Sequence, residues 1–514
     1  MSLIVIGFGG TGAKIVQSFL MMGASGALRL PRQVKVLLVD QDRGNGNTLR
    51  TVETLETYRV VKQILTDNDD PVRPFSVDFQ VYSDLVWQPL RRTKETLGGR
   101  FGYDPITHDR DLNSRLLELL YSEKQINEPL DKGFLGNPNI GAPVFADTIN
   151  FDEQPWKDLD QDMGAGLNTG GTRIVLCGSV FGGTGAAGIP NTAKLLRHRL
   201  REKHNDPDHE KAKIVLNLAM PYFTIREVDG AAVQADGKNF LPNCKAALQY
   251  YHDQKYLEFC DALYVLGEAD MAPIEASFLG DREQKNAAHP LELFAACNIF
   301  DALVSDDLDS KFILCRRARK EEYKWTDIPL RDSLVDQRDF VRARMGAFAR
   351  LSYALLCAKP GLLNFQRNGA VGDNGWITDY FHSNHDLDVG QFAKIEKFCR
   401  MYLEWAGEMQ LSAASMSSKH STYRAEWFDH QQIVEGDPRK LNVRLKDISD
   451  LNGLAKLVLP QVRQESCSYR DLHTYLNKLK STKTGFSGLI NGFYHGCGQN
   501  LNGFWGAIQK GAHA

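Results

Sequence analysis

Two glycine-rich loops constrain what this chain can fold into more than any other feature of its sequence. The first spans residues 7–12 (GFGGTG) and the second spans residues 178–185 (GSVFGGTG), and each follows a short apolar stretch and precedes a segment with helical spacing. Glycine tolerates positive φ and close contact with other groups. The unpaired amides at the start of a helix attract negative charge. The shared Gly-Gly-Thr-Gly core therefore predicts that one phosphate chain is held from two sides.

The composition is that of a globular protein without a strong charge. The chain has 514 residues, of which 43% are hydrophobic and 24% are charged, and its formal net charge is −3. This balance does not indicate nucleic-acid binding. The nine cysteines show no metal-ligand spacing, we find no signal peptide, and no apolar run approaches the ~20 residues of a membrane span. We expect a cytoplasmic protein with no membrane-spanning segment.

Alternating apolar strands and helices predict an α/β fold. Residues 3–6, the first glycine loop and residues 13–22 form a strand–turn–helix unit, and residues 34–39 form the next buried strand. The alternation resumes at residue 173. The segment 290–304 is apolar on most sides, which is typical of a buried helix. We predict a Rossmann-like parallel sheet with a long buried central helix.

The same pattern predicts two domains. Residues 1–305 are expected to form a nucleotide-binding domain, interrupted at about residues 43–165 by an irregular insertion rich in Gly, Pro, Asn and Asp. Residues 306–514 are expected to form a divergent α+β C-terminal domain. Long amphipathic helices are predicted within it at about 338–357 and 390–412.

The residues alone leave three interpretations of the glycine loops open. The loops can be tight strand-to-helix turns that bind no ligand. The first loop also fits the dinucleotide-binding pattern G-x-G-x-x-G, with Asp40 at the end of the second strand where an acid contacts ribose. A P-loop does not fit, because Ala13 precedes Lys14 and Ile15 stands where Ser or Thr should hold magnesium. The third interpretation is a nucleotide fold that uses both loops.

The third interpretation rests on a resemblance to a known family. Residues 175–190 resemble the G-G-G-T-G-[ST]-G signature of the tubulin/FtsZ superfamily of GTPases, and residues 6–12 are similar to the first nucleotide loop of that family. The resemblance covers about residues 1–50 and 172–305, and it is strongest for the bacterial tubulin-like branch. The positions that depart from the signature are Phe181, Ala186 and Ala187. These departures leave the hydrolysis of GTP open.

The resemblance implies GTP or GDP with Mg²⁺ as the ligand, and it implies which residues hold it. The contacts implied for the α- and β-phosphates are Gly9, Gly10, Thr11 and Gly12. The contacts implied for the β- and γ-phosphates are Gly182, Gly183, Thr184 and Gly185. The other loop positions expected at the site are Gly7, Gly178 and Ser179. Asp40 and Asp42 are expected near the nucleotide, with Asp42 as the candidate magnesium contact.

Two further regions are expected to hold the base and the ribose. In this family an aromatic and a polar residue four positions apart on the central helix stack on the base and read it, and Phe294 and Asn298 have that spacing. Residues i and i+4 share one face of a helix, and an amide can both donate and accept, as a guanine edge requires. The alternative is that Phe294 is ordinary core and Asn298 bridges a neighbouring backbone. Glu227 is expected to contact the ribose.

The catalytic acid is not identified by the sequence. The family places an acidic residue on a loop after the central helix, where it completes the nucleotide site of the neighbouring subunit. The corresponding window, residues 318–324, contains Glu321 and Glu322 as weak candidates, without the flanking family pattern. The alternative for this window is a charged edge strand.

The function implied by the resemblance is a GTP-binding protein that assembles head-to-tail into filaments, with GTP hydrolysed at the subunit junctions. Such a heterologous interface generates open-ended assemblies. Two other functions remain open. One is a non-polymerising guanine-nucleotide switch or scaffold that binds a protein partner through its C-terminal domain. The other is an NAD(P)-dependent Rossmann enzyme that uses only the first loop.

Overall fold

A computed structural model gives the arrangement of the chain. It describes residues 1–498 except for the following segments: 28–32, 66–72, 93, 107–110, 132, 135, 207–210, 226–239, 256–257, 269–270, 275–284, 305–307, 309–310, 317–334, 417–431, 449–468 and 480–482.

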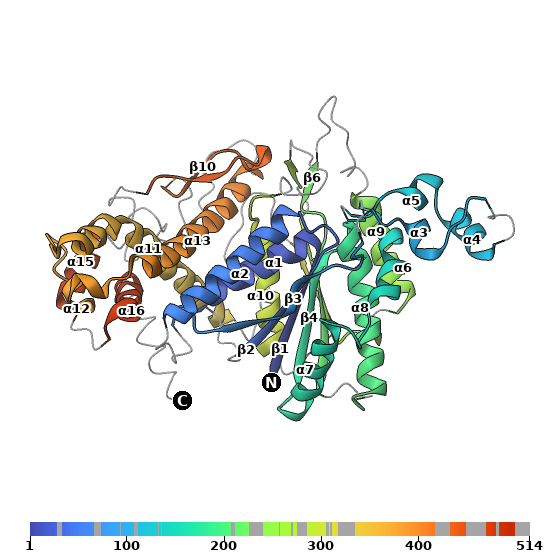
Figure 1. The fold of residues 1–514 in the computed structure, drawn as a ribbon, viewed down its shortest axis with the longest axis horizontal. Coiled ribbons are helices and arrows are strands. Elements are labelled where there is room, and N and C mark those ends of the chain that lie inside the picture. Colours follow the sequence, from blue (N-terminus) through green and yellow to red (C-terminus); the bar gives the residue numbers. More distant parts are fainter. Residues whose placement is uncertain are drawn as a thin grey trace.

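A parallel sheet forms the centre of the described part of the chain (Figure 1), with seven strands in the order β3-β2-β1-β4-β5-β7-β9. Its strands are β1 (Ser2–Phe8), β2 (Gln33–Val39), β3 (Asp78–Trp87), β4 (Thr172–Ser179), β5 (Ala212–Ala219), β7 (Ala262–Gly267) and β9 (Lys311–Arg316). All neighbouring pairs are parallel. The central strands are buried along most of their length, because helices cover both faces of such a sheet. The predicted α/β fold with a Rossmann-like parallel sheet is confirmed.

The direction of the strand order reverses between β1 and β4. The chain adds β2 and β3 on one side of β1, and it adds β5, β7 and β9 on the far side of β4. β1 and β4 are direct neighbours, and their pairing ends with Phe8 opposite Gly178. In open α/β sheets, ligands bind outside the carboxyl ends of the strands at such a reversal. The two glycine loops leave the two strands that flank this point.

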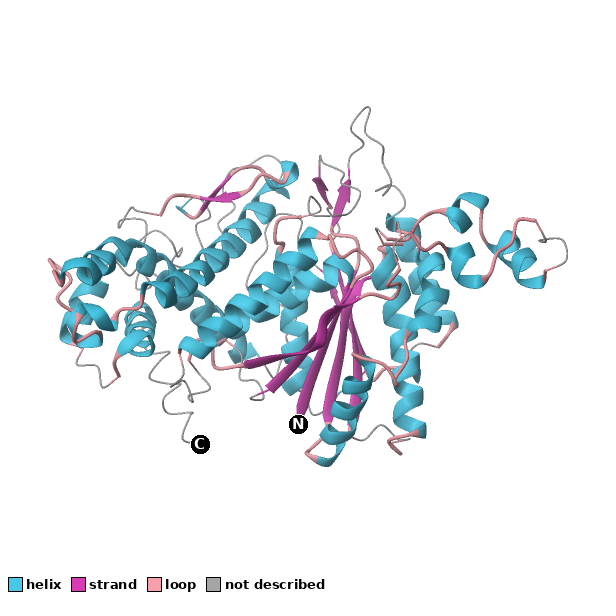
Figure 2. Cartoon of the chain, viewed as in Figure 1, coloured by secondary structure: helices cyan, strands magenta, loops and turns pink. Residues whose placement is uncertain are grey.

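The sheet is enclosed between two layers of helices (Figures 1 and 2). The layer on the face nearer the C-terminal helices contains α1 (Gly9–Ala24), α2 (Gly46–Ile64) and α10 (Pro290–Val304). The other layer contains α6 (Pro138–Thr148), α7 (Trp156–Asn168), α8 (Gly183–Glu202) and α9 (Phe240–Asp253). Every residue of α10 except Val304 is buried, so the predicted long buried central helix is present.

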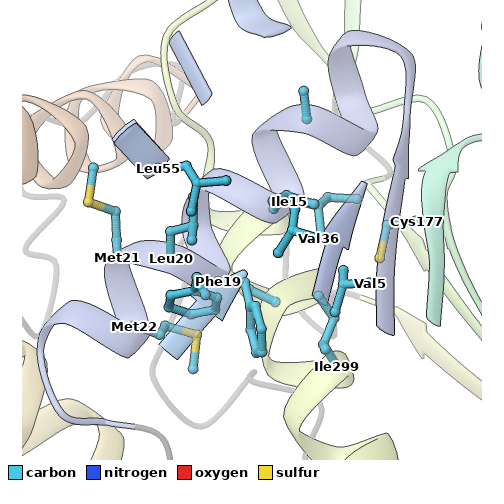
Figure 3. Packing of buried hydrophobic residues seen from close by; sticks show 14 of the residues in the cluster. Val5, Ile15, Phe19, Leu20, Met21, Met22, Val36, Leu55, Cys177 and Ile299 are labelled. Atoms are coloured by element: carbon cyan, nitrogen blue, oxygen red, sulfur yellow. The ribbon is translucent and has the colours of Figure 1, made fainter. Parts of the chain in front are cut away.

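The core of this face lies around α1 (Figure 3). Ile15 and Phe19 of α1 are fully buried, as are Val5 of β1 and Ile299 of α10. The run from Gly12 to Ala24 is buried on every side because α1 is held between the sheet, α2 and α10. This enclosure fixes the position of the first turn of α1, where the first glycine loop lies.

The C-terminal half is mainly helical and continues the same core. Its helices are α11 (Val335–Asn368), α12 (Ile377–Tyr380), α13 (Val389–Met416), α15 (Tyr469–Lys478) and α16 (Gly485–Gly498), with short 3₁₀ turns at η6 (Asn384–Asp386) and η8 (Pro438–Lys440). A small hairpin joins β10 (Val434–Glu435) to β11 (Arg444–Leu445). Trp405 Nε1 donates to Ser18 Oγ of α1 at 3.3 Å, and the Phe75 and Phe348 rings are 5.6 Å apart. The two predicted domains therefore meet through buried side chains.

Two boundaries differ from the sequence-based expectation. β9 lies beyond residue 305, yet it pairs with β7 and extends the central sheet. Within the expected insertion, α2 and the edge strand β3 belong to the sheet domain. β3 was missed because its sequence, DFQVYSDLVW, mixes polar and apolar residues, as an edge strand tolerates. The division into two domains stays a prediction.

The remainder of the expected insertion includes an arm that projects from the end of the molecule opposite the C-terminal helices (Figure 1). Its helices are α3 (Leu97–Phe101), α4 (Leu112–Leu120) and α5 (Glu123–Asn127). Arg100 anchors the arm through an ion pair with Asp147 of α6 at 2.5 Å. Across the described ranges, none of the helices combines the length and apolar character that crossing a bilayer requires.

Candidate functional site

The two glycine loops meet at the carboxyl ends of β1 and β4. Gly9 begins α1 directly after β1, and Gly183 begins α8 after β4. A Cβ added at Gly9 would lie only 3.2 Å from Cβ of Thr184. The loops are far apart in sequence, but the parallel pairing of β1 with β4 makes them a single surface.

Both helices that start at this surface have uncapped N-termini. The N-cap residues are Phe8 for α1 and Gly182 for α8, and neither makes a side-chain cap hydrogen bond. Neither helix has an acidic residue in its first turn. The first amides of a helix have no intrahelical acceptor, and the helix dipole makes this end positive. Two such ends at one surface can bind an anionic group.

Several loop glycines are required by packing. A Cβ at Gly12 would lie 2.5 Å from the carbonyl oxygen of Cys177, and a Cβ at Gly185 would lie 2.5 Å from that of Ser179. Gly7 and Gly178 are crowded in the same way by neighbouring backbone. These four glycines let the helices start close to the strands, which is a structural requirement independent of any ligand.

Other glycines of the loops face the open side. Gly9 has a φ of +65°, and it is only partly buried, as are Gly10 and Gly182. The atoms nearest to a Cβ at Gly10 would be side-chain atoms of Asn45 and Asn47, at 3.2 Å. At Gly183, by contrast, a Cβ would lie 2.9 Å from Phe134 Cβ, so this glycine is covered. Gly9, Gly10 and Gly182 are therefore where backbone can approach a ligand.

Three hydroxyl side chains belong to the loops. Thr11 is partly exposed, and Thr184 is 9% exposed beside Gly9. The hydroxyl of Ser179 is buried beneath the second loop, where a Cβ at Gly182 would lie 2.8 Å from it. Thr11 and Thr184 can thus donate to a group held between the loops, whereas Ser179 supports the loop from below.

Asp40 and Asp42 follow β2 and shape the turn into α2. Asp40 accepts hydrogen bonds from Thr48 Oγ1 at 2.7 Å and from the Asp42 amide at 3.2 Å. Asp42 Oδ1 accepts from the Gly44 amide at 2.9 Å. Both side chains are buried. Asn45 links this turn to the first loop. Its side chain accepts from the Thr48 amide at the start of α2, and it also lies beside Gly10.

Burial raises the pKa of Asp40 to about 7, although the hydrogen bond from Thr48 opposes this shift. Between pH 4 and 7 the folded protein therefore binds more protons at this position than the unfolded chain, so the free energy of unfolding falls as pH rises.

We expect Asp40→Asn to abolish this fall in the free energy of unfolding and to stabilise the protein by about 1–3 kcal/mol at pH 8. Urea unfolding at pH 5 and pH 8 measures the effect. A matched change of the exposed Glu435→Gln should leave the pH dependence unchanged, and an unchanged pH dependence in Asp40→Asn would contradict the prediction.

An ion-pair network that sequence reasoning missed lies one turn into α1. Lys14 Nζ is 2.5 Å from Glu292 Oε1 and donates to the Ala287 carbonyl at 2.8 Å. Tyr222 donates its hydroxyl to Glu292 Oε1 at 2.7 Å, and the His289 amide donates to Oε2 at 3.1 Å. Lys14 and Glu292 are both buried. The charge of Lys14 is therefore compensated by the start of α10 and is not directed at the loops.

A pocket opens beside this network. Its lining residues are Lys14, Tyr222, Phe223, Ile274, Asn286, Ala287, His289, Ser412, Pro438 and Arg439. The rings of Tyr222 and His289 are 4.9 Å apart. A small parallel pair of strands, β6 (Phe223–Ile225) and β8 (Ala272–Ile274), forms one side. The pocket adjoins the first loop, because the Asn286 amide donates to Asn47 Oδ1 at 2.9 Å and Asn47 also adjoins Gly10.

The predicted base-binding pair on α10 does not line this pocket. Phe294 is 6% exposed, and Asn298 is fully buried. Asn298 Nδ2 donates to Asn217 Oδ1 of β5 at 3.1 Å, and Asn217 Nδ2 donates to the Ala295 carbonyl at 2.7 Å. In this arrangement the side chain of Asn298 connects α10 to the sheet through the side chain of Asn217. The role of Asn298 in reading a base stays a prediction.

The remaining predicted site residues lie outside the described residues. These residues are Glu227, Glu321 and Glu322. Among the residues that the structure describes, no group of three or more His, Cys, Asp or Glu side chains is arranged to hold a metal ion. The magnesium contact of Asp42 stays a prediction.

Comparisons with known proteins give similarity among solved structures. No protein-family model and no curated protein matches the sequence. Among solved structures, the chain is similar to CetZ2 from Haloferax volcanii in a GTPgS-bound protofilament, a protein of the tubulin/FtsZ superfamily, with a TM-score of 0.25 and 12% sequence identity. The match covers 60% of this chain and 60% of that one, so this chain spans less than two thirds of that protein's length. The α/β fold class of this chain rests on the strand order of its own sheet.

Proposed function

We propose that this chain is a guanine-nucleotide-binding protein whose phosphate chain lies between the two glycine loops. The observation that carries the proposal is the meeting of two uncapped helix N-termini at the reversal of the strand order, with Gly9 next to Thr184. Backbone amides and the dipoles of α1 and α8 favour a multiply charged anion there. Gly9, Gly10 and Gly182 allow the phosphates to approach the backbone.

The adjoining pocket suits the base of the same nucleotide. It is linked to the first loop through Asn286 and Asn47, and the Tyr222 ring, which packs on that of His289, forms part of its wall. Lys14 and Tyr222 are held in place by Glu292, so this wall is ordered before a ligand binds. With its phosphates at the loops and its purine in the pocket, one nucleotide would lie across the start of α1.

Magnesium, when bound with the nucleotide, would compensate phosphate charge beside Asp40 and Asp42. The two carboxyl groups are linked to the first loop through Asn45, and burial raises the pKa of Asp40 to about 7. A carboxyl group with a raised pKa close to a candidate site is typical of functional positions. These residues fit the neighbourhood of a hydrated magnesium ion, a form in which Mg²⁺ is commonly held.

We further propose that nucleotide binding supports head-to-tail self-assembly, with GTP hydrolysis completed by a neighbouring copy. A switch or scaffold is the second candidate, and the hydrogen bond from the Ala288 amide to Glu408 of α13 favours it, because Ala288 follows the pocket residue Ala287. An NAD(P) enzyme is less well supported. The Asp40 carboxylate that would contact ribose already accepts two hydrogen bonds and is 3% exposed.

The first test is binding and turnover of GTP with Mg²⁺ by the purified full-length chain over a range of protein concentrations. We expect GTP to bind, and the turnover per protomer to rise above a threshold concentration if a second copy completes the site. Tight binding with flat turnover would favour the switch or scaffold. Binding of NAD(P) in place of guanine nucleotides would overturn the proposal.

A further inference from the structure

We propose that the C-terminal half of the chain builds one wall of the nucleotide pocket, and that Arg439 recognises the acceptor edge of the purine. This inference rests on the proposed function, which places the base in this pocket. Two segments from beyond residue 400 line it, namely Ser412 of α13 and Pro438–Arg439 of η8. They share the pocket with Lys14 and Tyr222 of the sheet domain. A ligand in the pocket therefore touches both halves of the chain.

The guanidinium of Arg439 is oriented by its neighbour Asp437. Arg439 Nε donates to Asp437 Oδ1 at 2.9 Å, and Nη2 donates to Oδ2 at 2.7 Å. The same carboxylate accepts the Arg439 backbone amide at 3.0 Å and so stabilises the start of η8. Such a two-point contact fixes the plane of the fork and reduces the ordering that ligand binding has to supply.

The guanidinium of Arg439 can bind only groups that accept hydrogen bonds. Arginine has five N–H donors and no acceptor. A guanine presents the acceptors O6 and N7 side by side, and arginine commonly contacts both, whereas adenine presents a donor amino group at the corresponding position. Both basic side chains of the pocket pair with a carboxylate, Lys14 with Glu292 at 2.5 Å and Arg439 with Asp437 at 2.7 Å, but the arginine alone has a planar fork of donors that matches two adjacent acceptors. Arg439 is thus the residue of this wall that is suited to distinguish guanine from adenine.

The wall is tied to the rest of the site through α13. Glu408 precedes Ser412 by one turn of this helix, and its Oε2 accepts from the Ala288 amide at 2.8 Å and from Arg50 Nη1 at 2.6 Å. Ala288 immediately follows the pocket residue Ala287, and Arg50 belongs to α2. The C-terminal wall and the sheet-domain wall are therefore held at a fixed separation, as base recognition requires.

The test compares wild type, Arg439→Ala and the matched control Arg444→Ala. Arg444 is 76% exposed, pairs with Glu435 on the nearby hairpin and does not line the pocket. Calorimetric titration of the full-length chain with GTP–Mg²⁺ and ATP–Mg²⁺ gives the affinities. We expect Arg439→Ala to weaken GTP binding by about 10- to 100-fold and to reduce the preference for GTP over ATP. Arg444→Ala should bind like wild type.

A second measurement tests the contact itself. The probe is 7-deaza-GTP, which lacks the N7 acceptor. Wild type should bind it about 10-fold more weakly than GTP, and Arg439→Ala should bind the two equally, because the partner of N7 is gone. Asp437→Asn, which keeps the arginine but weakens its orientation, should give an intermediate ratio. If Arg439→Ala does not fold, the ratio of GTP to 7-deaza-GTP affinity in Asp437→Asn still tests the contact.

The outcomes separate the two proposals. If wild type binds GTP and the ratio of GTP to 7-deaza-GTP affinity is the same in wild type, Arg439→Ala and Asp437→Asn, the role of Arg439 is overturned while the proposed function stands. If wild type binds no guanine nucleotide, the proposed function fails, and the inference built on it fails as well.

Discussion

Gly10→Asp should reduce guanine-nucleotide affinity by at least about 100-fold, because it places a carboxylate on the loop where a phosphate is proposed to lie, and like charges at close range cost several kcal/mol. Gly10 is suited to this test because it faces the open side of the site. The atoms nearest to a Cβ there are side-chain atoms of Asn45 and Asn47, at 3.2 Å. The folded state should therefore tolerate the substitution.

Gly10→Asn is the matched control, since it has the same shape as the aspartate and no charge. We expect it to lose much less affinity, and both variants to unfold at similar urea concentrations. Nucleotide content of the purified proteins and calorimetric titration with GTP–Mg²⁺ give the comparison. Equal GTP affinity in the aspartate and asparagine variants would show that no phosphate lies beside Gly10.

The position of the loops could be predicted because it depends on local sequence and on one rule of topology. Apolar strands followed by glycine turns and helices indicate strand–turn–helix units in a parallel sheet. Such a sheet brings the carboxyl ends of its strands to one edge. What the sequence did not indicate is which glycines serve packing. Gly12 and Gly185 are enclosed by the backbone of other segments, and a single sequence contains no record of those distances.

The pocket was missed because it is built by contacts between remote segments. Lys14 was considered only as a failed phosphate-binding lysine, whereas it pairs with Glu292 at the start of α10. Asn298 was predicted to read a base, which stays a prediction, and nothing in the sequence indicated its contact with Asn217 of β5. Helical spacing predicts that two side chains share a face. It does not predict whether that face meets the sheet or the opening of a pocket.

The contribution of the C-terminal half was also invisible to the sequence. Its long helices were predicted from their periodicity, and α11 and α13 are present and extend beyond the predicted bounds. No motif marked Ser412 or Arg439, because a pocket wall needs only one or two residues in the right place. The packing of α13 on α2 places them there. The link between the C-terminal half and the site is thus a property of tertiary packing.

Glu408→Gln should lower the free energy of unfolding by about 3–5 kcal/mol, because it removes the carboxylate that is hydrogen-bonded to the buried Arg50 guanidinium, although the attraction of Glu404 remains. Arg50 Nη1 lies 2.6 Å from Glu408 Oε2, and the two side chains are 7% and 4% exposed. The same oxygen accepts from the Ala288 amide, a hydrogen bond that the carbonyl oxygen of glutamine can still accept, so the expected loss comes from the missing charge. The urea midpoint of the full-length protein measures the change.

The control is the double variant Arg50→Met with Glu408→Leu, which removes both charges and keeps apolar side chains of similar size. Replacement of a buried ion pair by packed apolar residues is often neutral or stabilising, so this variant should unfold close to wild type. It lacks the hydrogen bond to the Ala288 amide, however. If α13 sets the position of the pocket wall through Glu408, the double variant should keep its stability and still bind guanine nucleotide more weakly. If Glu408→Gln is instead as stable as wild type, the packing of α13 on α2 does not depend on this ion pair.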